Sequence, residues 1–203
     1  MKIFLIHGLM ANATLNFFLL SRRLKNKGFK DIHALSYSSF TMDLETATKS
    51  CHKQILNVLH EDNSTEPIVL LGNSIGGVIA YNLLNTDLNV RLLIMIASPI
   101  KGCRFLDGMW DSVKSTIRHL TPVPILRDLC NKEDRSIIEP SVPYYTITSS
   151  LPSDEHYDGA IHRDDAVIDE GRNFHISKCS HTFLAIDRRC AEAVLGMLQV
   201  EGI

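Results

Sequence analysis

The sequence of 203 residues lacks the features that mark several large classes of protein. It has no continuous run of 18 apolar residues, so we expect no membrane-spanning helix. It also has no block of basic residues, and its formal net charge is only −2, so we expect no nucleic-acid partner. The apolar segment Met1–Leu5 is too short for a secretory signal peptide and precedes no small-residue cleavage site.

Cysteine pairs that would hold a metal or form a disulfide framework are missing too. The five cysteines are odd in number and scattered, and none belongs to a Cys-x-x-Cys pair. This pattern is typical of free thiols in a reducing compartment rather than of a zinc site or a secreted scaffold. We therefore expect a cytoplasmic protein without a metal site.

Phosphate-binding loops are likewise absent. The chain contains no G-x-G-x-x-G motif. A Walker loop needs a lysine followed by serine or threonine after its last glycine, whereas Gly76 is followed by Gly77 and Val78. The glycine-rich stretch around residue 76 therefore needs another explanation.

What the chain does contain is a series of short predicted strands that alternate with predicted helices. Its 45% apolar and 22% charged residues are typical of a soluble globular protein, and its length allows one domain over residues 1–203. Six segments are predicted to be strands, at Lys2–Ile6, Asp31–Tyr37, Pro67–Leu71, Val90–Ala97, Tyr144–Thr148 and Phe174–Ser177. Helical spacing predicts helices at 15–27, 44–59, 75–84, 105–120 and 188–198. Strands alternating with helices predict a parallel sheet covered on both faces.

A G-x-S-x-G motif, Gly72-Asn73-Ser74-Ile75-Gly76, lies directly between a predicted strand and a predicted helix. A serine on so tight a turn projects above the sheet at the helix N-terminus, where free N–H groups and the helix dipole stabilise an oxyanion. The residues two positions away must lack side chains for the turn to close, which explains both glycines. We predict Ser74 as a nucleophile; the alternative is a glycine turn that serves only strand–helix packing.

Acyl transfer at a serine needs two N–H donors for the tetrahedral oxygen. One comes from the residue after the nucleophile, which is Ile75. The other comes from a loop after an earlier strand, and Leu9 follows the first predicted strand and the flexible Gly8. Leu9 is therefore our candidate, and we interpret His7 as a residue that shapes this loop.

Nine histidines compete for the role of base. His181 lies after the last predicted strand, and a parallel sheet places its chemistry at the carboxyl ends of its strands. In this class of enzyme the catalytic residues follow one another along the chain in the order serine, acid, histidine, which also favours His181. The acid should lie in the preceding loop, where Asp158 and Asp165 stand out. Asp158 is nearer the strand and precedes a glycine, which favours a turn that aims the carboxylate; Asp165 remains the alternative.

Together these segments resemble the α/β-hydrolase superfamily, and within it the compact lipase-like and esterase-like members. The segments that carry the resemblance are Ile6–Leu9 in the first βαβ unit, Gly72–Gly77 at the elbow, Asp158–Ile161 at the acid and Cys179–Phe183 at the histidine. The resemblance implies a three-layer fold, with a mostly parallel sheet of about six strands in the order 2-1-3-4-5-6 and helices on both faces. It also favours Asp158 over Asp165.

The expected activity is hydrolysis of a small carboxylic ester by Ser74, His181 and Asp158, with no metal or organic cofactor. An acyl-thioesterase or acyltransferase would use the same residues, and a non-catalytic scaffold used for binding is the alternative outside enzymes. Residues 101–141 form a short excursion, so the resemblance implies a small cap or no lid. Its amphipathic part, 105–120, either walls an acyl pocket or packs on the sheet.

Overall fold

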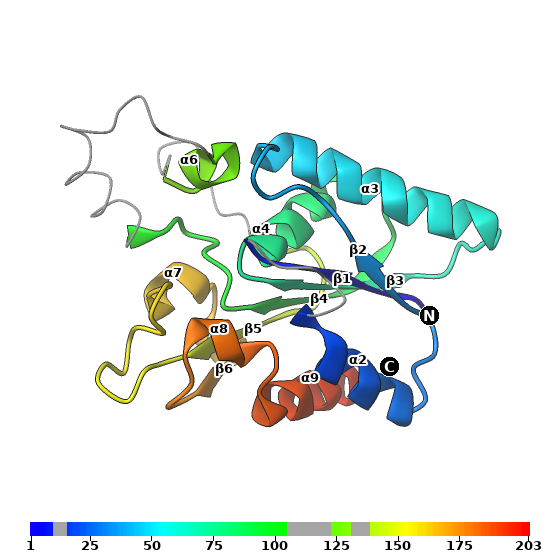
Figure 1. Ribbon diagram of the computed structural model, residues 1–203. Helices are drawn as coiled ribbons and strands as arrows, with labels where there is room; N and C mark the ends of the chain where they lie inside the picture. The colour runs from blue at the N-terminus through cyan, green and yellow to red at the C-terminus, as the bar shows by residue number, and fades with distance from the viewer. Residues whose placement is uncertain (10–15, 105–122, 131–138) are drawn as a thin grey trace.

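The structure, a computed structural model, describes residues 1–9, 16–104, 123–130 and 139–203. Its centre is a six-stranded sheet in which every neighbouring pair of strands is parallel (Figure 1). The strands are β1 (Ile3–Ile6), β2 (Ile32–Leu35), β3 (Ile68–Asn73), β4 (Val90–Ile96), β5 (Tyr144–Ser149) and β6 (Asn173–Ile176). They lie in the order β2-β1-β3-β4-β5-β6, which confirms the predicted strand order and fold class.

Both faces of the central strands are buried. Ile3 and Leu5 of β1 belong to one hydrophobic cluster, whereas Phe4 and Ile6 belong to another. Successive side chains of a strand point to opposite faces, so a strand covered on both sides must be apolar throughout. This requirement explains why the sequence signals for β1 and β3 are continuous apolar runs rather than alternating ones.

Helices form a layer on each face of the sheet. On one face lie α3 (Leu44–Glu61), α4 (Ile75–Asn82) and α6 (Pro124–Cys130), and on the other α2 (Phe18–Asn26) and α9 (Arg188–Val200) (Figure 1). The three layers agree with the predicted architecture.

Residues that are typical of helix ends mark three of the helix boundaries. The side chain of Asp43 accepts a hydrogen bond from the Thr46 N–H (2.7 Å) at the start of α3, and Asp187 accepts one from the Arg189 N–H (2.7 Å) at the start of α9. Such caps contribute about 1 kcal/mol each. After α2, Gly28 has a φ of 100°, the left-handed conformation that ends many helices.

Other helices differ from the prediction. The helix α6, which begins at Pro124, was not predicted. Proline suits the first helical turn, because it has no N–H to leave unpaired and its φ is already helical. Two short helices, α7 (Arg163–Ala166) and α8 (His181–Leu184), were not predicted, because four residues give no periodic pattern. The predicted helix at 105–120 lies outside the described residues.

The carboxyl ends of the strands meet at one edge of the sheet. The loop with Gly8 and Leu9 follows β1, and α4 follows β3. β5 leads into residues 150–162, and β6 leads into α8. All the candidate site residues therefore arrive at the edge where parallel sheets bind their ligands.

Candidate active site

Ser74 lies in the tight turn between β3 and α4, with a φ of 54° and a ψ of −124°. A positive φ at a residue with a side chain costs about 1–3 kcal/mol, and the surrounding structure must impose it. Two hydrogen bonds hold the turn: the Ser74 N–H donates to the Ile96 carbonyl (2.7 Å), and the Gly77 N–H donates to the Ser74 carbonyl (3.0 Å). The serine is thus presented at the start of α4 by its backbone.

The glycines of the motif make this turn possible. A Cβ on Gly72 would lie 2.3 Å from the carbonyl oxygen of Gly76, and a Cβ on Gly76 would lie 2.1 Å from that of Ile6. The sequence reasoning missed Gly77, where a Cβ would lie 1.8 Å from Ser98 Oγ. The doubled glycine after the motif was the signal that would have found it.

His181 lies between Ser74 and Asp158. Its Nε2 is 3.1 Å from Ser74 Oγ, and its Nδ1 is 2.9 Å from Asp158 Oδ2. A proton on Nδ1 can donate to the carboxylate, which leaves Nε2 to accept the serine proton. Three segments that are distant in the sequence thus form one hydrogen-bonded series.

Asp158 is 2% exposed, yet its side chain is well provided with donors. Oδ1 accepts hydrogen bonds from the N–H groups of Ala160 (2.9 Å) and Ile161 (2.6 Å), while Oδ2 faces His181. The intervening Gly159 has a φ of 100°, as the tight turn requires. The His181 N–H also donates to the Asp158 carbonyl (2.8 Å), so backbone as well as side chain joins the two residues.

Asp165, the alternative acid, is buried elsewhere. Its Oδ2 accepts from the Arg104 N–H (2.9 Å), and its Oδ1 is 2.9 Å from Arg104 Nε. The structure therefore brings Asp158, and not Asp165, to His181.

A cavity of about 550 Å³ opens beside Ser74 and His181, and Leu9 and Ile75 line it. Both predicted N–H donors thus belong to residues on the cavity wall. Much of the rest of the wall is apolar, including Pro99, Leu126, Leu129 and Ile161. The volume lies within the range typical of small-molecule sites, which is about 300–1,000 Å³.

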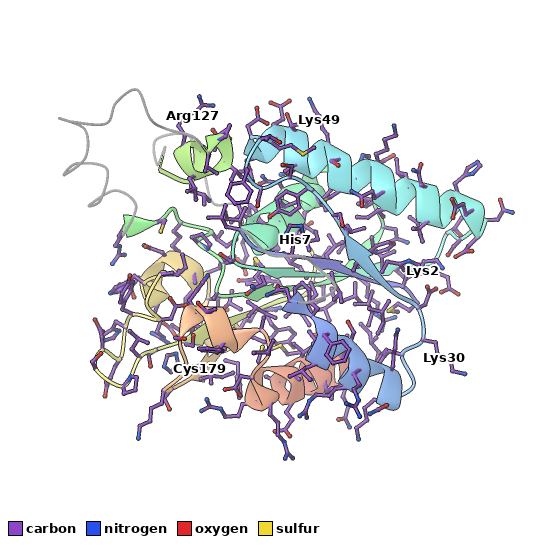
Figure 2. The ribbon with its side chains drawn as sticks, viewed as in Figure 1. Lys2, His7, Lys30, Lys49, Arg127 and Cys179 are labelled. Carbon is purple, nitrogen blue, oxygen red and sulfur yellow. The ribbon has the colours of Figure 1, made fainter. Side chains whose placement is uncertain are left out.

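His7 directly follows β1 and lies beside the start of α4 (Figure 2). Its ring stacks on Tyr37 with centroids 4.4 Å apart, and its Nδ1–H donates to the Gly8 carbonyl (2.8 Å). The Tyr37 hydroxyl donates in turn to the His7 carbonyl (2.8 Å). Burial lowers the pKa of His7, which favours the neutral ring. These contacts fit the interpretation of His7 as a residue that shapes the loop.

A pair of asparagines beside the nucleophile was not predicted. Asn73 Nδ2 donates to Asn16 Oδ1 (3.2 Å), and both residues line the cavity. Asn73 occupies a variable position of the G-x-S-x-G motif, so the motif gives it no role. No signal in the sequence pairs it with a residue 57 positions away.

Comparisons with protein-family models and with curated proteins find no match, but solved structures do match. The lin2722 gene product of Listeria innocua has a TM-score of 0.68 at 16% identity, over 98% of this chain and 94% of that one. The mature form of lipase BlEst2 from Bacillus licheniformis has a TM-score of 0.68 at 13% identity, over 98% of this chain and 90% of that one. The chain has the α/β-hydrolase fold.

The α/β-hydrolase fold is shared with a lipase-esterase related protein from Clostridium acetobutylicum, at a TM-score of 0.66 and 14% identity, over 97% of this chain and 93% of that one. It also matches part of a longer protein. Phospholipase PlaB from Legionella pneumophila has a TM-score of 0.63 at 13% identity, over 82% of this chain, which spans only 45% of PlaB. The resemblance to lipase-like proteins is thus confirmed for the fold.

Two kinds of feature are absent from the residues that the structure describes. No helix there has the length and apolar character needed to cross a membrane. In the same ranges, no three His, Cys, Asp or Glu side chains are grouped so as to hold a metal ion. A second hollow, of about 630 Å³, follows β6 and α9 and is lined by neither Ser74 nor His181.

Proposed function

We propose that this chain is a serine hydrolase that cleaves carboxylic esters, with Ser74 as nucleophile, His181 as base and Asp158 as acid. One observation carries the proposal: the hydrogen-bonded series from Asp158 through His181 ends at a strained serine on a cavity wall. A serine hydroxyl becomes a good nucleophile only when an adjacent base takes its proton, and that base needs a third group to orient it. A turn that served packing alone would not need a side chain at its strained tip.

In the first half of the reaction, Ser74 Oγ attacks the ester carbonyl while His181 Nε2 takes the hydroxyl proton. The carbonyl oxygen becomes an oxyanion, which the N–H groups of Ile75 and Leu9 stabilise by hydrogen bonds. Donors fixed in advance contribute strongly, and removing one such donor typically costs about 10²–10³ in kcat. His181 then gives its proton to the leaving alcohol, and the acyl group remains on Ser74.

The second half repeats the chemistry with water. His181 takes a proton from water, the hydroxide oxygen attacks the acyl carbonyl, and the proton returns to Ser74 Oγ as the carboxylic acid leaves. Asp158 stays ionised throughout and stabilises the imidazolium form of His181. No step requires a metal or an organic cofactor.

The chemistry of the cavity wall supports an acyl ester as substrate. Leu126 and Leu129 of α6 and Ile161 of the acid segment give the wall an apolar surface, which suits the hydrocarbon part of an acyl group. Each CH₂ group that becomes buried there contributes about 0.8 kcal/mol. An acyl chain is therefore expected to lie against α6.

A fluorophosphonate probe tests the nucleophile directly, because it reacts with an activated serine. We expect the wild type to be labelled and to hydrolyse p-nitrophenyl esters, and Ser74→Ala to do neither, with kcat reduced at least about 10⁴-fold. Ser177→Ala, which removes the hydroxyl of an exposed serine, is the matched control and should behave as wild type. Esters and thioesters of several chain lengths should be assayed side by side.

A wild-type protein that is folded, takes no label and hydrolyses no ester would contradict the proposal. Hydrolysis that persists in Ser74→Ala would remove Ser74 from the mechanism.

A further inference from the structure

Asp165 is a buried carboxylate that takes no part in the proposed reaction. Its side chain is only 3% exposed, whereas that of Arg104, its partner, is 51% exposed. Burying a carboxylate is costly unless it is paired and hydrogen-bonded. The contacts of Asp165 therefore need an explanation, and they lead to the active site.

Three contacts attach Asp165 to the segment that follows β4. The Arg104 N–H donates to Oδ2 (2.9 Å), and the Arg104 Nε lies 2.9 Å from Oδ1. The Lys101 N–H donates to the Asp165 carbonyl (2.9 Å). Backbone and side chain of Asp165 thus tie α7 to residues 101–104.

α7 directly follows the turn that carries the proposed acid, here called the acid turn (residues 157–162). The Asp165 N–H donates to the His162 carbonyl (2.9 Å), at the end of the acid turn. Within the turn, the N–H groups of Ala160 and Ile161 hold the Asp158 carboxylate. A further contact, from Cys103 Sγ to the Ala160 carbonyl (3.7 Å), joins the same two segments. A shift of α7 would therefore move the donors that aim Asp158.

We propose that Asp165 is a positioning residue of this active site: by holding Arg104, it fixes the acid turn so that Asp158 stays aligned with His181. This inference rests on the proposed function, because it concerns the same three residues. It also gives separate roles to the two aspartates that the sequence offered as acids.

Asp164 provides a matched control. It is the neighbouring residue, and its Oδ2 lies 3.2 Å from Arg104 Nη1, but its side chain is 53% exposed. Exposed ion pairs contribute little because water screens them. Asp164→Asn and Asp165→Asn therefore remove the same charge beside the same arginine, and differ in burial and in attachment to the Arg104 backbone.

The kinetic test separates kcat from KM. We expect Asp165→Asn to lower kcat by about ten- to a hundredfold, because a small misplacement of a catalytic group has effects of this size. KM should change by a smaller factor than kcat, since most of the residues that line the cavity beside Ser74 lie outside the acid turn. Asp164→Asn should retain both values. A folded Asp165→Asn with wild-type kcat would overturn the proposal.

A double-mutant cycle tests whether Asp165 acts through Arg104. Adding Arg104→Gln to Asp165→Asn should cause little further loss of kcat, because both changes disrupt the same contact between the Arg104 and Asp165 side chains. Losses that multiply would show independent effects and would overturn the proposal. If Asp165→Asn fails to fold, Arg104→Lys replaces it; that variant keeps the charge, loses the Nε donor and should show a milder fall in kcat at unchanged KM.

A spectroscopic measurement separates this inference from the proposed function. A His181 Nδ1–H proton bonded to a carboxylate gives a far-downfield proton resonance, which is assigned by its loss in His181→Ala. Asp165→Asn should weaken or shift this resonance, and Asp164→Asn should not. If the wild type hydrolyses no ester, the proposed function fails, but this resonance still tests whether Asp165 keeps Asp158 aligned with His181. An unchanged resonance in folded Asp165→Asn would overturn the positioning role of Asp165.

Discussion

At the scale of single residues, the site depends on one strained backbone position and on the hydrogen bonds that surrounding groups make with it and with the buried carboxylate. Ser74 adopts a positive φ, and both its N–H and its carbonyl are hydrogen-bonded. Asp158 is buried, with donors to both carboxylate oxygens. The strain and the buried charge are tolerated because surrounding groups are fixed around them.

Replacing Asp158 by asparagine should show what its charge contributes. The amide would favour the wrong tautomer of His181 and would not stabilise the imidazolium, so kcat for ester hydrolysis should fall about 10⁴-fold. Steady-state kinetics measure the loss, and circular dichroism checks that the variant is folded. If kcat falls less in Asp158→Asn than in Asp165→Asn, Asp158 is not the acid.

The sequence predicted the residues that chain order and turn chemistry specify. Ser74 follows from its motif between strand and helix, and His181 from its place after the last strand. The structure brings the favoured Asp158 to His181, as the glycine after it suggested. The pairing of Asn16 with Asn73 was beyond prediction, because side-chain contacts between distant segments depend on the packed fold and leave no local pattern.

At the scale of elements, the close fit between β1 and the start of α4 constrains the site. A Cβ on Gly76 would lie 2.1 Å from the Ile6 carbonyl oxygen and 2.4 Å from that of His7. Gly76→Ala should therefore force the helix away from β1 and lower the free energy of unfolding by about 3 kcal/mol or more. Ester hydrolysis should fall with it.

Gly196→Ala is the matched control for that substitution. Gly196 lies in α9, where an added Cβ would meet nothing within 4 Å. Alanine there should raise the free energy of unfolding by about 0.5–1 kcal/mol, because glycine is a poor helix former. Denaturant unfolding measures both variants, and equal effects would contradict this account of the elbow.

The cap of α9 should make stability depend on pH. The hydrogen bond with Arg189 lowers the pKa of Asp187 from 3.8 to about 2. A carboxyl whose folded pKa is depressed stabilises the fold above its unfolded pKa, and this stabilisation is lost as the pH falls through about 2. Asparagine caps helices equally well, so Asp187→Asn removes mainly the charge.

We therefore expect Asp187→Asn to lower the free energy of unfolding by about 0.5–1 kcal/mol at pH 7. The difference from wild type should shrink steadily below about pH 4. Thermal melts between pH 7 and pH 3 measure it, and a difference that stays constant over that range would rule out the charge as its cause.

Sequence patterns predicted long elements better than short ones. α3 and α9 have periodic apolar faces and aspartate caps, so both were found with their N-terminal boundaries. α7 and α8 are held by tertiary hydrogen bonds, such as that from the His181 N–H to the Asp158 carbonyl, and a single turn has no periodicity. A proline can begin a helix as well as end one, and Pro124 begins α6.

At the scale of the whole molecule, the parallel sheet was predictable because apolar strands alternate with helices, and its order came from the family resemblance. Burial is uneven across the sheet. Every residue of β1 and β3 is buried, whereas the edge strands β2 and β6 are partly exposed. Stability should therefore differ between centre and edges.

Hydrogen exchange should reveal this difference. Amides of β1 and β3 should exchange only through global unfolding, because both faces of these strands are covered. Amides of β6 and α8, at the edge that carries His181, should exchange through smaller local openings. Exchange measured by NMR under native conditions provides the comparison, and equal protection in β3 and β6 would contradict it.

The order of synthesis gives the wide spacing of the candidate site another meaning. Ser74 precedes the proposed base, His181, by 107 residues, and β6, which leads to His181, lies at the outer edge of the sheet. Proteins are made from the N-terminus, so the elbow exists on the ribosome well before His181 has been added. A nascent or truncated chain would therefore lack the proposed base, and we expect ester hydrolysis to begin only after the last strand has docked.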